Sequence, residues 1–556
     1  MKSLLTFCII QTLIVCTFAQ DIKWGEELNK KRSSTISSII GVDGENTYAI
    51  MYHRPMSING MKADDNYYIT RFDQSYNIKE QEELSFKEKS TNLDYAYTLF
   101  LDGKLYSFAI FDNYKLRRRF LFVYELDKNS LKVKSGPKKI AETNISKVKY
   151  SPSFTGSLKR EKGEIMHAVS NDRSHLVLLS RGYVETEKPA EFLVQVFDGD
   201  MNLIWEQNET TEKDDQLFDI RGVVVDNLGN VNILTQEFFK LDKDIEKSKE
   251  KLKAKTVIDG KPNYQYSLMS YRNKGTETKA YLLKPEEGFL RKIRMETNNR
   301  NDLIIFGFFG NEKSYENTQG FYYQTIDGTT GEVSSERFEY FSQEFIDEFA
   351  EKEKDKGRDE LWNVNAYAII PAKNGDFIVL GEFFRSTTST TYKPDGLDEG
   401  FRTTQYYNYG DILIWRVNPQ NGIVWYDIIP KYQRTAVASI ASSGMDYFYV
   451  DDANRVRGGV GSFIWAAMDD GIKMLYCEDP KQKEDFKKKK SGVTSDFVWS
   501  LVEVSWDGES SEQILKNNIP QKAWLVPGAC SQTGPSKMLL LANERWTYQL
   551  GTIIFR

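Results

Sequence analysis

Only a few residue groups in this sequence have spacings that could hold a metal ion. The segment Asp198–Asn202 (Asp-Gly-Asp-Met-Asn) alternates carboxylate and amide oxygens, as the start of a calcium-binding loop does. Leu203 stands at the sixth position, where such a loop needs glycine. The chain has 3 histidines and contains no His-Glu-x-x-His motif and no cysteine–histidine cluster. The segment therefore predicts a hairpin turn, and we expect no metal site.

Nucleophilic and acid–base catalysis have no clear sequence signature here. There is no Gly-x-Ser-x-Gly elbow, and the glycine cluster Gly458–Ser462 leads into the apolar run Phe463–Trp465 rather than into a phosphate-binding helix. Asp327–Gly331 has the Asp-x-x-Thr-Gly turn of quinoproteins, but no docking tryptophan follows it, so we expect no cofactor. The 80 acidic residues allow carboxylate pairs anywhere, and spacing alone selects none of them. We therefore predict no catalytic residue.

The cysteines allow at most one structural disulfide. Of the 4 cysteines, Cys8 and Cys16 lie in the N-terminal apolar segment, which leaves Cys477 and Cys530 in the rest of the chain. These two could form a bridge between neighbouring units of the fold. Two separate buried thiols, packed as small apolar side chains, are the favoured alternative.

The best candidate for a ligand-facing loop is the Thr- and Tyr-rich insertion Ser386–Tyr409. It separates two strand-like runs, and binding residues tend to lie on loops that a rigid scaffold holds in place. The predicted ligand-binding side chains are its tyrosines Tyr392, Tyr406, Tyr407 and Tyr409.

The elements that must position these residues are short β-strands in a repeating pattern. A turn rich in Gly, Asp and Asn precedes a short apolar run, as in Leu101–Lys104 before Leu105–Phe108 and in Asp226–Asn230 before Val231–Leu234. A second hairpin follows, as in Phe122–Asp127, and two hairpins make one four-stranded unit. Eight such units can be counted along the chain. The units recur irregularly and their excess length lies in insertions, but two hairpins per unit are typical of a β-propeller blade.

The two ends of the chain complement each other. Asp21–Glu27 has the apolar-Trp-acidic pattern that is found in outer strands around Trp205 and Trp425, yet it stands alone before the first unit. The last unit, Met538–Phe555, lacks such a strand. We therefore predict an all-β fold with eight four-stranded blades, in which the N-terminal strand closes the last blade; seven blades with irregular additions is the alternative. Trp24, Trp205 and Trp425 are expected to wedge between blades.

Composition and charge limit the class of protein further. Residues 1–19 have Lys2, an apolar run and Ala19, which predicts a secretory signal peptide and leaves residues 20–556 as one propeller domain. Charged insertions, with predicted helical character, lie near 242–255, 343–360 and 481–490. The net charge of −6 argues against nucleic acid as a partner, and no later segment is long and apolar enough to predict a transmembrane anchor.

Three stretches in the second half have a specific wording: Ile429–Thr435 (Ile-Pro-Lys-Tyr-Gln-Arg-Thr), Gly461–Ala467 and Leu539–Arg545. Together with the Thr- and Tyr-rich insertion, they resemble a family of uncharacterised exported proteins of Bacteroidetes-type bacteria. This chain departs from the family pattern by the extra segment Ala436–Gly458 and by Glu478-Asp479 in place of Asn-Asp. The resemblance implies an all-β exported protein in a Gram-negative envelope, in the periplasm, on the outer surface or in the medium. It implies no catalytic residue.

These observations predict an exported, non-enzymatic binding module that recognises an envelope protein or a glycan with its loop face. The alternative is a polysaccharide hydrolase or lyase with carboxylates in the central funnel, which would gather several acids and a basic residue in one pocket. A structural component of a secretion or adhesion apparatus is a third hypothesis, and it would require a large apolar surface patch.

Overall fold

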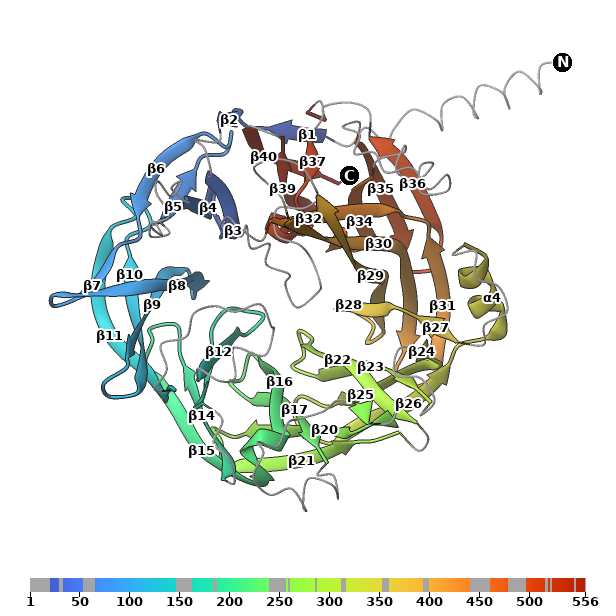
Figure 1. Cartoon of the computed structure of the whole chain (residues 1–556), viewed down its shortest axis with the longest axis horizontal. Helices are drawn as coiled ribbons and strands as arrows, with labels where there is room; N and C mark the ends of the chain where they lie inside the picture. The colour runs from blue at the N-terminus through green and yellow to red at the C-terminus, as the bar shows by residue number, and fades with distance from the viewer. Residues whose placement is uncertain are drawn as a thin grey trace. The chain divides into compact units, whose positions relative to one another are not determined.

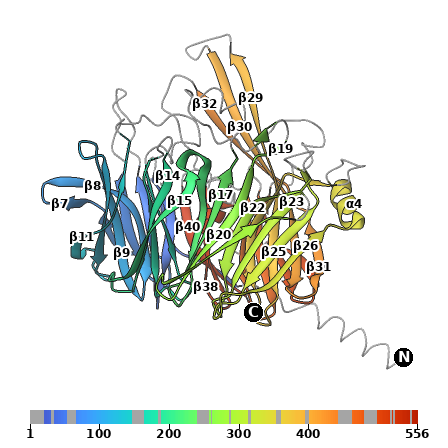
Figure 2. The same ribbon diagram turned by 90° about the horizontal axis from the view of Figure 1, so that it is seen from below.

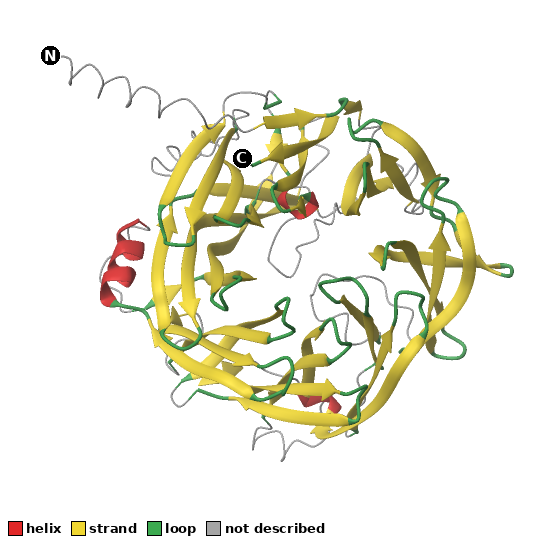
Figure 3. Cartoon of the chain, turned by 180° about the vertical axis from the view of Figure 1, so that it is seen from behind, coloured by secondary structure: helices red, strands yellow, loops and turns green. Residues whose placement is uncertain are grey.

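A computed structural model describes residues 21–29, 34–53, 66–146, 163–183, 188–239, 257–258, 261–285, 288–311, 317–352, 360–393, 400–440, 461–478, 497–515, 519–520, 523–544 and 547–555. They form two compact units. The larger unit comprises Glu82–Arg385 and Gly410–Lys431, and the smaller comprises Met1–Gln81, Ser386–Tyr409 and Tyr432–Arg556. Strands dominate both units (Figure 3).

The fold is an all-β propeller of eight blades, as the sequence predicted (Figure 1). In the larger unit, blade 2 consists of β8 (Thr91–Leu101), β9 (Lys104–Asn113), β10 (Arg118–Leu126) and β11 (Val133–Asn144), with β7 (Phe86–Glu88) paired to β8. Blade 3 consists of β12 (Glu164–Val169), β13 (Leu176–Arg181), β14 (Pro189–Phe197) and β15 (Leu203–Asp214). Blade 4 consists of β16 (Phe218–Val225), β17 (Val231–Phe238), β20 (Tyr264–Arg272) and β21 (Glu277–Leu283).

The larger unit continues with blade 5, which consists of β22 (Phe289–Thr297), β23 (Leu303–Gly310), β25 (Gly320–Ile326) and β26 (Val333–Tyr340). Blade 6 consists of β28 (Val364–Pro371), β29 (Phe377–Lys393), β30 (Gly400–Asn418) and β31 (Gly422–Ile429). Two short ribbons accompany these blades, β18 (Val257–Ile258) with β19 (Lys261–Pro262) and β24 (Asn317–Thr318) with β27 (Leu361–Trp362). The 3-10 turn η1 (Asp215–Leu217) links blades 3 and 4.

The smaller unit contains the other three blades. Blade 1 consists of β3 (Ser34–Asp43), β4 (Asn46–His53), β5 (Asn66–Phe72) and β6 (Ile78–Glu83). Blade 7 consists of β33 (Ile464–Ala467), β34 (Gly471–Glu478), β35 (Val498–Ser505) and β36 (Ser510–Leu515). Blade 8 consists of β37 (Trp524–Leu525), η2 (Pro527–Ala529), β38 (Ser531–Gly534), β39 (Lys537–Asn543), β40 (Thr547–Ile554), β1 (Asp21–Trp24) and β2 (Leu28–Asn29).

Burial follows the position of each strand in its blade. The central strands β13, β23 and β25 are buried along their whole length, which explains their nearly continuous apolar sequences. The outer strand β15 mostly alternates exposed and half-buried residues, and its exposed positions other than Leu203 are polar or charged: Glu206, Asn208, Thr210, Glu212 and Lys213. Charged outer strands of this kind discourage pairing with other chains.

The N-terminal strand completes the last blade, as predicted. β1 pairs antiparallel with β40, from Asp21 opposite Ile554 to Trp24 opposite Gly551. The Trp24 ring meets the Trp499 ring of blade 7 edge-on, with ring centroids 5.9 Å apart. A Cβ atom at Gly551 would lie 2.4 Å from the Trp24 ring, so glycine is required at this position. The smaller unit is therefore held by a pairing between the two ends of the chain.

Trp205 also occupies the predicted position between blades. Its indole nitrogen donates a hydrogen bond to the carbonyl oxygen of Gly229, at 3.2 Å, and its ring packs near Tyr271 of blade 4. Gly275 has a φ of +78° and its backbone lies against the same ring. Trp425 is half-buried on the outer strand β31.

One predicted insertion contains a helix, α4 (Gln343–Lys352). Phe345, Ile346 and Phe349 on this helix are buried in the core of the larger unit, so the helix packs through one apolar face. The insertions predicted near 242–255 and 481–490 lie outside the described residues. Within the part of the chain that the structure describes, no helix is both long and apolar enough to cross a membrane.

Candidate functional site

The two ends of a blade differ in the length of the connections between strands. Because the four strands are antiparallel, the turns between strands 1 and 2 and between strands 3 and 4 share one end, which we call the turn end. The other end of the blade holds the connection between strands 2 and 3 and the link to the next blade. We call it the loop end. In the larger unit the turn-end connections are short. The long β17–β20 connection, the α4 segment and the β29–β30 hairpin all belong to the loop end.

Side chains that cap their own backbone close the turns. The Asp198 carboxylate accepts hydrogen bonds from the backbone N–H groups of Asp200 and Asn202, at 2.9 and 2.8 Å, and from the Asn202 amide. Asp226 makes the same set of bonds with Leu228 and Asn230. The segment that resembles a calcium loop is therefore a hairpin turn, as predicted, and its carboxylate is already occupied by N–H donors.

The turns of neighbouring blades are also linked to one another. The Asp102 N–H donates to the Arg173 carbonyl oxygen, the Asp172 N–H to Asn227 Oδ1, and the Asn227 N–H to Asn301 Oδ1, at 2.9 to 3.0 Å. We call this row, which runs from blade 2 to blade 5, the turn belt. These backbone and amide groups of the turn belt are therefore already paired with one another.

The predicted loop Ser386–Tyr409 is an extension of blade 6. β28 pairs with β29 only as far as Phe383, and β31 pairs with β30 only from Ile412 onward. Beyond these points the two strands continue, and residues 402–409 of β30 pair with β32 (Gln433–Ile440) (Figure 2). We call residues 386–409 and β32 the arm. The sequence predicted a loop here, whereas the chain forms strands because its Thr and Tyr residues favour extended backbone.

The predicted tyrosines of the arm have different environments. Tyr409 is fully buried, and a Cβ atom at Gly461 would lie 2.1 Å from its ring, so this tyrosine packs in the interior and does not face a ligand. Tyr407 is half-buried, and burial raises the pKa of its hydroxyl. Tyr406 is half-buried and carries the Arg434 guanidinium over its ring, 4.1 Å from the ring centroid. Tyr392 lies on β29.

The larger unit contains a buried ionic cluster that sequence reasoning missed. Lys431 Nζ lies 2.6 Å from Glu382 Oε1, and their side chains are 0% and 2% exposed. The backbone N–H of Lys431 donates a hydrogen bond to Asp411 Oδ1 at 3.0 Å, and Asp411 is also buried. Glu382 precedes the arm on β29 and Asp411 follows it on β30. The sequence shows the Ile-Pro-Lys motif that contains Lys431, but it does not show that Glu382 and Asp411 contact this lysine.

The next polar residue of the motif anchors the arm within the smaller unit. The buried Gln433 amide donates to the carbonyl oxygens of Ser462 and Cys477, at 2.9 and 2.7 Å. A buried amide with two such bonds fixes the start of β32 against blade 7. The arm is therefore held by specific polar contacts at its base.

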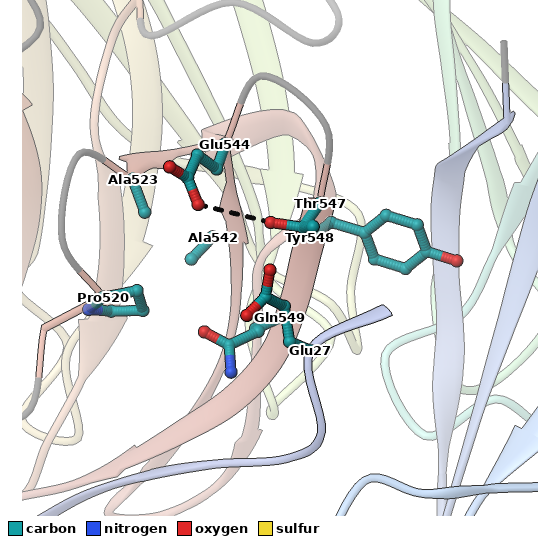
Figure 4. Close-up of a pocket in the computed structure, with 8 residues that line it drawn as sticks. All are labelled: Glu27, Pro520, Ala523, Ala542, Glu544, Thr547, Tyr548 and Gln549. Carbon is teal, nitrogen blue, oxygen red and sulfur yellow. Dashed lines mark hydrogen bonds between the residues drawn. The ribbon is translucent and has the colours of Figure 1, made fainter. Parts of the chain in front are cut away.

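A pocket of about 410 Å³ lies at the loop end of blade 8. It is lined by Glu27, Pro520, Ala523, Ala542, Glu544, Thr547, Tyr548 and Gln549 (Figure 4). The Thr547 hydroxyl donates to Glu544 Oε2 at 3.3 Å. No lysine, arginine or histidine is among the described residues that line it, so the pocket does not combine several acids with a base.

The two cysteines have separate partners. Cys477 is buried and its sulfur accepts the N–H of Leu525 at 3.3 Å. The Cys530 thiol donates to the Val526 carbonyl oxygen and accepts the N–H of Leu541, both at 3.2 Å. Both are free thiols in the structure, which agrees with the favoured alternative of two separate apolar residues.

The described residues contain no group of three or more His, Cys, Asp or Glu side chains placed to hold a metal ion. The fold and the described surfaces therefore define a β-propeller with an elaborated loop end, and they assign no reaction to it.

Comparisons with known proteins add no family. No family model matches the sequence, and no curated protein matches it. Among solved structures, the β-propeller domain of the Trilobed protease from Pyrococcus furiosus has 11% identity and a TM-score of 0.35, covering 88% of this chain and 100% of that one. A Synechocystis apocarotenoid oxygenase has 10% identity and a TM-score of 0.31, covering 90% and 94%. The WD40 domain of SCAP from fission yeast has 9% identity and a TM-score of 0.26, covering 83% and 92%. At these values no activity is transferred to this chain.

Proposed function

We propose that this chain is an exported binding module of the cell envelope, which recognises a protein or a glycan through its loop end and uses the arm as its main recognition element. The observation that carries the proposal is the contrast between the two ends of the blades. The turn belt uses its polar groups internally. The arm, by contrast, carries exposed Ser386, Thr388 and Ser389 on strands whose base is fixed.

Two further features support this proposal. The predicted signal peptide at residues 1–19 and the resemblance to exported proteins support an envelope location. Among the described residues, the pocket at Glu27 and Glu544 does not show the several acids and basic residue that we expect of the enzyme alternative.

The test places the same acidic side chain at the two ends. One variant carries Ser386→Glu and Ser389→Glu on the arm, and the matched control carries Asn129→Glu and Thr329→Glu on exposed turns. The protein beginning at residue 20 is used in pull-downs from envelope extracts and on a glycan array. We expect the arm variant to lose the ligand that the unaltered protein captures, and the turn variant to keep it. Loss in the turn variant alone would place recognition at the other end and refute the proposal.

A further inference from the structure

The guanidinium of Arg434 is held by an aromatic ring. It lies on β32 opposite Asn408 of β30, and its guanidinium stacks on the ring of Tyr406, 4.1 Å from the centroid. An aromatic ring attracts the cation and fixes its plane, yet it leaves the N–H donors at the edge of the guanidinium unused.

Three other half-buried or buried arginines are neutralised by carboxylates: Arg119 pairs with Asp112, Arg181 with Asp215, and Arg416 with Asp376, at 2.5 to 2.7 Å. Among the described residues no carboxylate pairs with Arg434, and its buried Nε atom has no hydrogen-bond partner. A half-buried guanidinium that meets no carboxylate among the described residues can bind an external anion, because part of its hydration has already been removed.

The surroundings of Arg434 indicate which anion fits. Successive residues of a strand point to opposite faces, and the Thr388 and Gln405 side chains hydrogen-bond on one face of the arm. The other face therefore carries Thr387, Ser389, Tyr406, Asn408 and Arg434, which we call the arginine face. Apart from Arg434, these five residues carry hydroxyl, amide and phenol groups.

A face of this composition fits a carbohydrate better than a protein. Interfaces between proteins have an apolar central region, whereas none of the exposed large apolar side chains of the described residues belongs to the arm. Hydroxyl and amide groups around a tyrosine ring match the alternating hydroxyl groups and C–H surface of a sugar.

We propose that the arginine face binds an acidic polysaccharide, with Arg434 on a carboxylate or sulfate group and the hydroxyl side chains on neighbouring sugar hydroxyls. This inference rests on the proposed function and names the ligand class of the same arm.

The experiment is native electrophoresis of the protein beginning at residue 20 in gels that contain polygalacturonate, dextran sulfate or neutral dextran. We expect retardation by at least one anionic polymer and none by neutral dextran; comparison of the two anionic gels separates carboxylate from sulfate. Arg434→Gln should weaken binding about tenfold or more. Arg434→Lys, which keeps the charge but loses the planar stack, should have an intermediate effect.

The matched control is Arg221→Gln, which removes the same charge from an exposed arginine that pairs with Asp219. It should bind as the unaltered protein does, and circular dichroism should show all variants folded. Equal weakening by Arg434→Gln and Arg221→Gln would mean non-specific charge attraction and would overturn the inference. Failure to bind any anionic polymer would also overturn it; if the arm then captures a neutral glycan or a protein, the proposed function stands and only the ligand class is wrong.

Discussion

Lys431 and Glu382 form an ion pair of 2.6 Å in which neither side chain is more than 2% exposed. Removing one partner leaves the other charge buried without compensation, which costs about 3–5 kcal/mol in comparable pairs. We expect Lys431→Met and Glu382→Gln each to lower the free energy of unfolding by that amount in urea titrations. The double variant should recover part of the loss.

The exposed pair Lys279–Glu332 is the control for this prediction, since its side chains are 40% and 73% exposed. Lys279→Met should change the unfolding free energy by less than about 1 kcal/mol. A loss of similar size in both pairs would show that burial does not determine the cost.

Gly461 should be intolerant of even the smallest side chain. Its Cβ would enter the buried ring of Tyr409, so Gly461→Ala should destabilise the protein by about 1–3 kcal/mol through overpacking. Gly528, which has open space around it, is the matched position, and Gly528→Ala should leave the melting temperature nearly unchanged. Thermal unfolding followed by circular dichroism compares them. Equal tolerance at both sites would contradict the packing around Tyr409.

The pairing of β1 with β40 should contribute measurably to stability. Ile22 is 5% exposed in the core of blades 7 and 8, so Ile22→Ala should cost about 2–5 kcal/mol. Leu203, which is 47% exposed on an outer strand, is the comparison, and Leu203→Ala should be nearly neutral. Chemical denaturation of both variants is the measurement; a neutral Ile22→Ala would argue that the N-terminal strand adds little.

The cysteines should react as thiols. Alkylation in denaturant without a reductant should label both Cys477 and Cys530, and prior reduction should not increase the mass shift. Labelling that appears only after reduction would show a disulfide in the exported protein.

The predicted leader gives a prediction of its own. Protein recovered from the envelope or medium should begin at Gln20, as intact-mass measurement would show. A cytoplasmic protein that retains residues 1–19 would contradict the proposed export.

The blade pattern could be predicted because it is local. Turn residues and apolar runs lie next to each other in the sequence. The strand around Trp24 has the sequence pattern of an outer blade strand, and this pattern indicated that it pairs with a blade elsewhere in the chain. The environment of each tyrosine in the arm could not be predicted in this way. Tyr406 and Tyr409 have the same composition around them, and only contacts with Arg434 and Gly461, which lie 28 and 52 positions away by the sequence numbers, decide which ring is buried. The partners of Lys431 could not be predicted either, because they are also distant in the sequence.

The bond from the Gln549 amide to the Gly25 carbonyl oxygen spans 524 positions. Blade 8 therefore cannot be completed until almost the entire chain has been synthesised. Contacts of such long sequence separation form late and slow the last step of folding. Until then the strand Asp21–Trp24 and the strand Thr547–Ile554 each present an unpaired edge, so the newly made chain is most exposed to aggregation before these two strands meet.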